Sequence, residues 1–554
     1  MAGPASTDNY YDLGTYRRDI DTTSPDAQVW FGRGLVWAYA FNHEEAIRCF
    51  EHALTYDPGL AIAHWGIAYA VGPNYNKGWD AFDPVDLAES LHRARAELDL
   101  AATGRANDIE RGLISSLRQR FPSDDNALTA GHAAYADAMT GLAAAYPGDL
   151  DVVALAADAQ LNVTAWALWD GRTGLAANGS RVADAIGLLE SALSTPAGRS
   201  HPGVLHLYLH AMEMSATPEA ALPAADLLRG LVPDAGHLQH MPSHIDVLCG
   251  NYHDGIVANQ AAVQADRKYL ADRGAIDFYA LYRAHDLHFI VYCAMFAGDS
   301  AIALEAADEL RAQLTPELLS VTSPPMADWL EAFVPLRVHV LIRFGRWAEL
   351  IACPLPDDVA LYATTCATVH YGRGIALAAT GDIEAAKTAR SAFVAAHAAI
   401  PASRYLFNNS CRDILAVAAA MLDGEIAYRE GDFDAALRYL QRAVELDDAL
   451  PYDEPWGWMQ PTRHAYGALL LEQGRVAEAA SVYAADLGYD PAVSRSSHHP
   501  NNVWSLHGYH ECLQRLGRDD EAVIVGQQLK LALARADVPI EASCACRLSS
   551  GGCC

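Results

Sequence analysis

Positive charge is scarce in this sequence of 554 residues. It contains 39 Lys and Arg against 69 Asp and Glu, which gives a formal net charge of −30 at pH 7. Nucleic-acid binding needs a surplus of basic side chains that neutralise phosphates, so nucleic acid is excluded as the main partner. Lysine is especially rare, and no lysine directly follows a glycine, which excludes the G-x-x-x-x-G-K loop of P-loop ATPases and kinases. The lysines are Lys77, Lys268, Lys387 and Lys530.

Long hydrophobic runs are also missing. No uncharged apolar run reaches the ~18 residues that span a membrane. The segment from Met1 to Tyr10 has neither the basic nor the apolar part of a secretory signal. The 11 cysteines are too sparse for a disulfide scaffold. We therefore expect a cytoplasmic protein without a membrane partner. Hydrophobic residues still make up 51% of the chain, so a large buried core is possible.

A helix-turn-helix repeat is visible in residues 27–58, AQVWFGRGLVWAYAFNHEEAIRCFEHALTYDP. Large and small residues recur there at helical spacing on one face of each of two predicted helices. Small residues let the two backbones approach, while aromatic rings fill the space between them. The spacing resembles the 34-residue tetratricopeptide repeat (TPR). The residues that carry it are Trp30, Gly34 and Trp37, then Ala46, Phe50 and Ala53, and finally Pro58.

Related units return along the chain, and the resemblance covers most of residues 27–536. It implies an all-α fold, a TPR-like α-solenoid of antiparallel helix pairs that forms a curved superhelix. We divide the chain into an N-terminal extension (1–26), one continuous solenoid (27–536) and a cysteine-containing tail (537–554). No segment alternates as a strand does, and longer loops are expected near 72–88, 120–130, 165–182 and 485–502. The clearest further units contain Gly424, Gly467 and Trp504, and weaker ones centre on Gly250, Gly298, Gly345 and Gly381.

Histidine is concentrated in the centre of the predicted solenoid, residues 202–298. Eight of the 22 histidines lie between residues 206 and 288, well above their share. Seven of these histidines and one glutamate form three sets. Within each set the residues are three, four or seven positions apart, so they lie on the same face of a helix. The sets are His206, His210 and Glu213; His237, His240 and His244; and His285 and His288.

When the repeat is aligned along the chain, each set lies on the first helix of a repeat. It occupies the face of that helix that does not pack against the second helix. That face lines the concave groove of TPR proteins, so the resemblance implies that all eight side chains face the groove. His206, His240 and His288 take the same position in three successive repeats. Because neighbouring first helices pack about 8–10 Å apart, we expect side chains from adjacent repeats to converge on one point.

Seven imidazoles and a carboxylate in one groove favour a transition metal. Imidazole is a common ligand of Cu, Zn and Fe, and one site needs only about three or four protein ligands. For any single histidine the alternative is a solvated side chain or one that binds a peptide carboxylate. No H-E-x-x-H occurs, which excludes a zincin-type helix. The predicted direct ligands are His206, His210, Glu213, His240 and His244; the predicted orienting or acid–base groups are His237, His285 and His288.

The histidine segments resemble an uncharacterised group of bacterial TPR proteins with an HxxxHxxE, GHxxHMPxH and HxxH centre. In this chain they read HLYLHAME at 206–213, GHLQHMPSHI at 236–245 and HDLHF at 285–289. Trp65-Gly66, Gly72-Pro73-Asn74 and Arg463-His464 fit the same group. The resemblance spans nearly the whole chain but implies little about activity. One departure is Asp286, where the group would carry Asn, and it leaves the polarity of that groove position open.

Four cysteines stand at the end of the chain, and we expect a flexible tail there because apolar periodicity is missing. The thiolates of Cys544 and Cys546 could both reach one soft metal ion, so this pair is a weaker candidate for metal binding. It would either complete the histidine site or deliver metal to it. The alternatives are a redox-active thiol pair or an end without a role. The remaining two are Cys553 and Cys554.

Three functions are compatible with these features. The favoured one is a TPR-like protein with a histidine-rich metal site in its concave groove, which as a metalloenzyme would act on a small molecule or peptide. The second is a non-catalytic scaffold that binds a peptide or protein partner. The third is a metal carrier that uses the groove histidines and the tail cysteines. The reaction, the substrate and the metal stay open.

Overall fold

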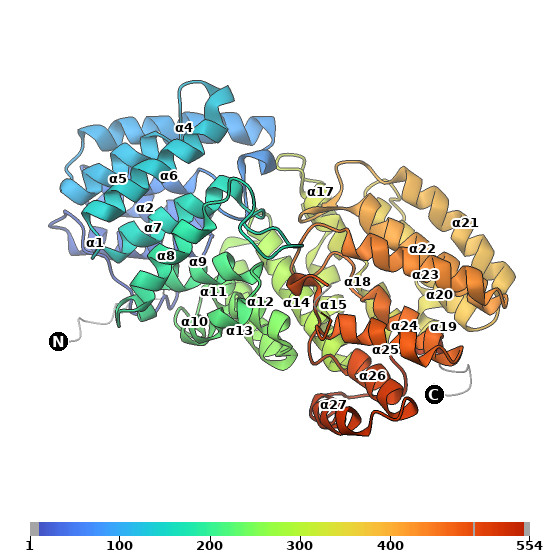
Figure 1. Cartoon of the computed structure of the whole chain (residues 1–554). Coiled ribbons are helices and arrows are strands. Elements are labelled where there is room, and N and C mark those ends of the chain that lie inside the picture. Colours follow the sequence, from blue (N-terminus) through green and yellow to red (C-terminus); the bar gives the residue numbers. More distant parts are fainter. Residues whose placement is uncertain (1–9, 491–492, 548–554) are drawn as a thin grey trace.

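The computed structural model describes residues 10–490 and 493–547. Successive helices pack as antiparallel pairs, which makes the fold the expected all-α, TPR-like solenoid (Figure 1). The α-helices of the first half are α1 (Pro25–Tyr39), α2 (His43–Tyr56), α3 (Ala61–Ala70), α4 (Pro84–Thr103), α5 (Asp108–Arg118), α6 (Leu128–Ala145), α7 (Leu150–Leu161), α8 (Val182–Leu193), α9 (Pro202–Glu213), α10 (Leu222–Leu228), α11 (Gly236–His240), α12 (Pro242–Cys249) and α13 (Tyr252–Arg273).

The second half continues this pattern to the C-terminal end. Its α-helices are α14 (Ala280–Ala297), α15 (Ser300–Gln313), α16 (Pro316–Leu319), α17 (Met326–Leu330), α18 (Leu336–Arg343), α19 (Trp347–Ala352), α20 (Ala363–Ala379), α21 (Ile383–Ala399), α22 (Cys411–Arg429), α23 (Phe433–Asp448), α24 (Thr462–Glu472), α25 (Val476–Asp486), α26 (Val503–Arg515) and α27 (Asp519–Leu533). Short 3-10 helices are η1 (Trp79–Ala81), η2 (Asp125–Ala127), η3 (Asn162–Thr164), η4 (Gly198–Ser200), η5 (Pro218–Ala221), η6 (Glu331–Phe333), η7 (Arg495–Ser497) and η8 (Ala545–Arg547).

The glycine–aromatic spacing in the sequence has a direct packing cause. The ring of Phe50 lies between Gly34 of its own repeat and Gly66 of the next. A Cβ atom would lie 2.5 Å from this ring at Gly34 and 2.8 Å from it at Gly66, so only glycine lets the three helices approach. The same arrangement recurs in the C-terminal repeats with Tyr483, Gly467 and Gly508.

The weaker repeat units are centred on turns that need glycine. These glycines have left-handed backbones and separate the two helices of a pair, the usual way to end a helix before an abrupt turn. The φ angles are +76° at Gly250, +77° at Gly298, +64° at Gly345 and +91° at Gly381. The expected long loops occur between α3 and α4, α5 and α6, α7 and α8, and α25 and α26.

Two hydrophobic cores meet in the middle of the molecule. The first core runs from Tyr11 to Tyr282 and the second from Val247 to Met459, so both include residues of α12 to α14. In Figure 1, α1 to α13 lie on one side, α17 to α27 lie mostly on the other, and α14 and α15 lie between them. The first half also closes on itself, because α9 contacts α1. The central helices are therefore covered from both sides.

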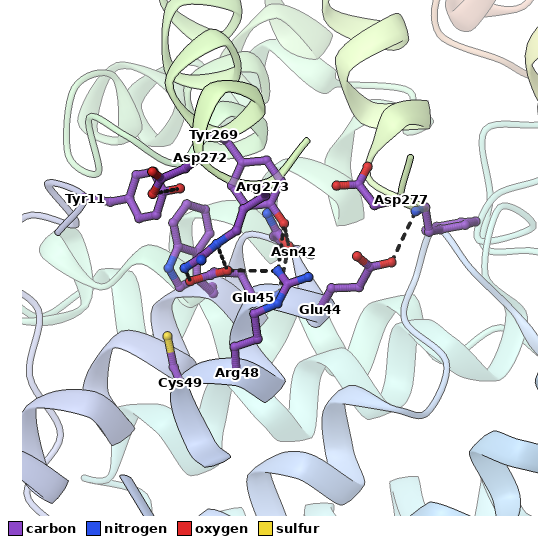
Figure 2. Close-up of polar contacts among 12 residues, drawn as sticks. Tyr11, Asn42, Glu44, Glu45, Arg48, Cys49, Tyr269, Asp272, Arg273 and Asp277 are labelled. Atoms are coloured by element: carbon purple, nitrogen blue, oxygen red, sulfur yellow. Dashed lines mark hydrogen bonds and ion pairs between the residues drawn. The ribbon is translucent and has the colours of Figure 1, made fainter. Parts of the chain in front are cut away.

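A network of ion pairs ties the start of the chain to α13 (Figure 2). Glu45 on α2 is only 1% exposed, and its two carboxylate oxygens accept hydrogen bonds from Tyr10 at 2.8 Å and from Arg273 at 2.8 and 2.9 Å. Arg48 pairs with the same carboxylate at 3.0 Å. This network closes a loop of more than two hundred residues and fixes the segment that joins α1 to α2.

Two expectations need correction. The tail is not a free end in its described part. Asp537 accepts hydrogen bonds from two backbone N–H groups at the start of α15, and Arg547 pairs with Glu511 on α26. A short hairpin, which the sequence did not indicate, also occurs. Its strands are β1 (Tyr405–Leu406) and β2 (Asn409–Ser410).

We expect the substitution Glu45→Ala to lower the free energy of unfolding by about 2 kcal/mol. This is below the ~3–5 kcal/mol of a fully buried pair, because Arg48 and Arg273 are partly exposed. Urea unfolding monitored by circular dichroism measures the change. Glu51→Ala on the same helix is the matched control, since Glu51 is half-exposed and pairs with Arg93 on the surface. An equal loss in both variants would contradict the structural role of Glu45.

Candidate metal centre

The eight residues singled out by their spacing all lie in the interior. They come from α9, α11, α12 and α14, and the most exposed of them, His285, is 8% exposed. The expectation of an open concave groove is therefore wrong, because α1, α13 and the 405–410 and 451–460 segments cover these side chains. The helix expected to carry His237, His240 and His244 is also interrupted, ending as α11 at His240 and resuming as α12 at Pro242.

The side chains gather in three groups, of which the second and third share His244. Within each group the potential ligand atoms lie within 4.8 Å of one another. The first triad is His206, His210 and His237; the second triad is His240, His244 and His285; the third group is Glu213, His244 and Glu454. Every member is buried. His288 stands apart from these groups, and its Nε2 lies 2.9 Å from the sulfur of Met459.

Oxygen acceptors orient four of the histidine rings through Nδ1. The Nδ1–H of His206 donates to the carbonyl of Tyr39 at 2.6 Å, and that of His240 donates to Oδ1 of Asn259 at 2.6 Å. Asn259 cannot flip without cost, because its amide N–H donates to the carbonyl of Gly255. These contacts place the ring proton on Nδ1 and leave Nε2 with a free lone pair.

Glu213 connects the two triads. Its Oε1 lies 3.1 Å from Nδ1 of His210, and its Oε2 lies 2.9 Å from Nδ1 of His244. The carboxylate of Glu454 approaches the same Nδ1 of His244. When Glu213 is ionised, it therefore keeps the protons of both imidazoles on Nδ1. The glutamate expected to be a direct ligand is thus positioned to orient two ligands at once.

Two pairs of Nε2 atoms face one another, and in each of these rings except that of His237 the Nδ1 atom is held by an oxygen acceptor. Nε2 of His240 lies 2.7 Å from Nε2 of His244, and Nε2 of His206 lies 3.1 Å from Nε2 of His237. With both Nδ1 atoms protonated, the His240–His244 contact brings two lone pairs together without a hydrogen atom between them. Within the described ranges, Nε2 of His210 and Nδ1 of His237 and His285 have no hydrogen-bond partner. A bound cation would satisfy these acceptors, so the residues present fit a metal ion.

Burial keeps these imidazoles neutral, which metal binding requires. Desolvation, and then the neighbouring histidines, lower the pKa of His206, His210, His237, His240 and His285 well below 6.5. Desolvation also raises the pKa of Glu213, and it raises that of Glu454 more strongly. Each carboxyl therefore gains from a cationic neighbour, and a metal ion close by would favour its ionised form.

Three aromatic residues with left-handed backbones surround the triads. Phe41 has φ +55°, Trp166 has φ +59° and Phe407 has φ +47°. Phe41 stacks on His210 and His237, with ring centroids 5.7 and 5.4 Å apart. Phe407 contacts His285 and Trp166 contacts His210 through their rings. For bulky residues this conformation is strained, and such strain is concentrated at functional sites.

Several site residues gave no usable signal in the sequence. Glu454 lies in the irregular 451–460 segment, and Asn259 belongs to α13, whose other buried residues are mostly apolar. Asp286 was noted only as a departure from the HxxH segment. Its Oδ1 lies 3.2 Å from Nδ1 of His240, and burial beside Asp266 raises its pKa well above 3.8. Position 286 is therefore buried and polar, and it contacts a triad residue directly.

The tail cysteines lie outside all three groups. Cys544 and Cys546 form a disulfide with each other and pack against α22, α23 and α24. In the structure they contribute no ligand to the histidine triads. Cys553 and Cys554 lie outside the described residues.

A cavity of about 180 Å³ opens next to the second triad. Its wall reaches His244 and His285 and otherwise consists mainly of aromatic, polar and acidic residues. The aromatic and apolar residues are Trp166, Phe278, Leu281, Tyr282, Trp329, Tyr405 and Phe407; the acidic ones are Asp80, Asp453 and Glu454.

Comparisons with known proteins support the repeat and leave the site open. Residues 27–60 match the tetratricopeptide repeat family, in the segment where the sequence shows the clearest unit. A search of curated proteins finds no match to the chain. A solved structure of Naa15/Naa10 bound to HypK-THB is similar at 15% identity over 91% of this chain and 70% of that one, with a TM-score of 0.22. So low a TM-score does not establish a shared superhelix. No described helix is long and apolar enough to cross a membrane.

We expect the metal-free protein to lose stability in acid, partly through His288. Burial lowers its pKa from 6.5 to about 3, so between these values the unfolded chain binds a proton that the folded chain does not. Stability therefore falls as pH drops below 6.5, by about 1.4 kcal/mol per pH unit for one histidine. In urea unfolding between about pH 6 and pH 4, His288→Leu should show a shallower loss by that amount. The exposed His92→Leu variant should keep the wild-type slope, and identical slopes in both variants would refute the assignment.

Proposed function

We propose that this protein binds two transition-metal ions in its interior, one in each histidine triad. The observation that carries the proposal is the set of imidazole nitrogens turned toward one another, while oxygen acceptors hold the opposite nitrogen of four rings. Metal-binding histidines have this arrangement, because an acceptor on one ring nitrogen fixes the lone pair of the other. A packed interior without a ligand would instead leave several nitrogens without partners.

The donor set favours zinc, copper or iron. Three neutral imidazoles suit each of these ions, whereas magnesium and calcium prefer oxygen ligands. A three-histidine site also leaves one coordination position open, as in catalytic rather than structural zinc sites. The bound ion would supply Lewis acidity or, if it is copper or iron, electron transfer.

The second triad is the candidate reactive site, because the cavity reaches it. A cavity of about 150 Å³ holds one benzene ring, so the 180 Å³ space fits a small molecule better than a peptide. Its aromatic walls, with no Lys or Arg among the described lining residues, favour a neutral or cationic aromatic compound over an anion. In this proposal the protein is a metalloenzyme, and its reaction stays open.

Metal analysis of the purified, untagged protein tests the two-ion proposal. We expect about two equivalents of one metal, in line with three or four ligands per site. His237→Ala and His285→Ala should each lose about one equivalent, and the double variant should lose both. These residues suit the test because their Nδ1 atoms have no partner in the described part of the chain, so their removal leaves no Nδ1 acceptor unpaired.

The exposed His92→Ala variant is the control and should keep both ions. Glu213→Gln adds a sharper test, since glutamine replaces one of the two acceptor oxygens by an NH2 group, which cannot accept the Nδ1–H of the imidazole that it faces. It should weaken metal binding by about 10–100-fold at the triad that loses its acceptor, as is typical when an orienting partner is lost. Wild-type protein that stays metal-free after incubation with Zn, Cu and Fe salts would refute the proposal.

The ligand class is tested with phenol, benzylamine and benzoate, measured by calorimetry on the metal-loaded protein. We expect phenol and benzylamine to bind, and benzoate to bind at least about tenfold more weakly because no Lys or Arg among the described lining residues can pair with its carboxylate. Leu281→Trp should fill the cavity and abolish binding, while Leu227→Trp on the surface of α10 should not change it. Tighter binding of benzoate than of phenol would contradict this ligand class.

A second candidate is a scaffold for a protein partner, favoured by the tetratricopeptide match at residues 27–60. Such repeats usually present a curved surface to a peptide or protein. The enclosed histidines would then be a structural feature of the core. Metal analysis separates the two candidates, because a scaffold needs no ion and binds its partner equally well after chelation.

A further inference from the structure

A different cluster of buried polar side chains surrounds Arg120 in the first half of the molecule. Arg120 lies two residues after the end of α5 and is fully buried. Its Nε and both terminal nitrogens have no hydrogen-bond partner anywhere in the described residues. A guanidinium stays protonated and carries five N–H donors. An unpaired charge in a protein interior is among the most unfavourable arrangements, so a missing partner has to be identified.

Aromatic rings partly enclose this guanidinium. Its central carbon lies 5.3 Å from the ring centroid of Tyr135 on α6 and 5.9 Å from that of Tyr69 on α3. His132, one turn before Tyr135, has its ring centroid 5.8 Å from that of Trp79. The rings offer cation–π stabilisation, but they accept none of the five N–H groups in a normal hydrogen bond.

The neighbours add more donors than acceptors. Nε1 of Trp79 and Nε1 of Trp65 are buried without a partner, and an indole nitrogen can only donate. The hydroxyl of Tyr135 and Nδ1 of His132 are likewise buried without partners. Burial and the charge of Arg120 lower the pKa of His132 to about 3, so His132 is neutral and the guanidinium supplies the positive charge. The cluster therefore lacks an acceptor, not a donor.

A carboxylate on α7 does not fill this role. Oδ2 of Asp158 accepts a hydrogen bond from Tyr69 at 3.0 Å, and its Oδ1 accepts one from Asn162 at 2.8 Å. It makes no hydrogen bond to Arg120 within the described chain. Asp158 thus influences the guanidinium only from a distance, and the donors remain available for a ligand.

We propose that Arg120, Trp79, His132 and Tyr135 form a buried binding site for one monovalent anion, either chloride or the carboxylate of a small organic acid. A single negative charge matches the single guanidinium, and the N–H and O–H donors of these four residues would replace its water shell. A divalent phosphate would bring one uncompensated charge into an aromatic, poorly solvated space. This site is independent of the histidine triads.

Equilibrium dialysis of the full-length protein against radiolabelled chloride, and separately against radiolabelled formate, tests the proposal. We expect about one bound anion per chain, as one guanidinium implies. Chloride binding that formate displaces supports the site and shows that it accepts both chloride and a carboxylate. Formate binding without chloride binding assigns it to a carboxylate ligand. A folded wild-type protein that binds neither anion would overturn the proposal and leave water as the partner of Arg120.

Three variants locate the site. Arg120→Gln should weaken binding by more than about tenfold, the loss expected when hydrogen bonds to a charged group are removed. Arg118→Gln, an exposed change at a residue paired with Asp99, should bind like the wild type. Asp158→Asn keeps Arg120 and removes a competing negative charge, so it should bind the anion more tightly. This variant stays informative if Arg120→Gln fails to fold, and unchanged affinity in Asp158→Asn would count against the site.

Discussion

The structure depends on enclosing seven imidazole rings and their carboxylate partners away from water. Transfer of polar groups into a protein interior is unfavourable unless their hydrogen-bonding atoms are satisfied. Here four Nδ1 atoms are satisfied by oxygen acceptors from α1, α9, α13 and the 451–460 segment, while Nε2 of His210 has no partner among the described residues and Nε2 of His240 faces only that of His244. The surrounding helices and loops hold these side chains in place. Residues with strained left-handed backbones and ion pairs outside the cluster both contribute to this.

Both halves of the molecule contribute to the enclosure. In the first half, the Glu45 network fixes the α1–α2 connection, where Phe41 has a left-handed backbone and stacks on two histidines. In the second half, the short hairpin brings Phe407 onto His285, and the loop between α23 and α24 brings Glu454 to His244. A two-residue strand pair has little stability of its own. Its position is therefore maintained by packing against the central helices rather than by the hairpin itself.

The sequence predicted what local periodicity determines. Gly34 and Phe50 indicated the close helix packing, and the spacing of His206, His210, His237 and His240 placed each set on a single face. It could not predict what covers those faces, because Phe407 and Glu454 come from loops more than a hundred residues away and carry no periodic signal. The groove was inferred from the resemblance to TPR proteins, and that resemblance does not indicate which later segments cover the concave side. The tail was misjudged for the same reason, since Asp537 and Arg547 make contacts that only the tertiary structure brings together.

The two buried polar clusters differ in the charge of the ligand that would complete them. Around the triads, ring nitrogens with free lone pairs outnumber donors, so the interior there is complementary to a cation. Around Arg120, N–H donors outnumber acceptors, so the interior is complementary to an anion. A hydrophobic core that only needed to be stable would use neither arrangement, because apolar residues of similar volume are usually at least as stabilising as incompletely paired polar ones. That two such imbalances of opposite sign occur in one chain is most simply explained by bound partners that complete them.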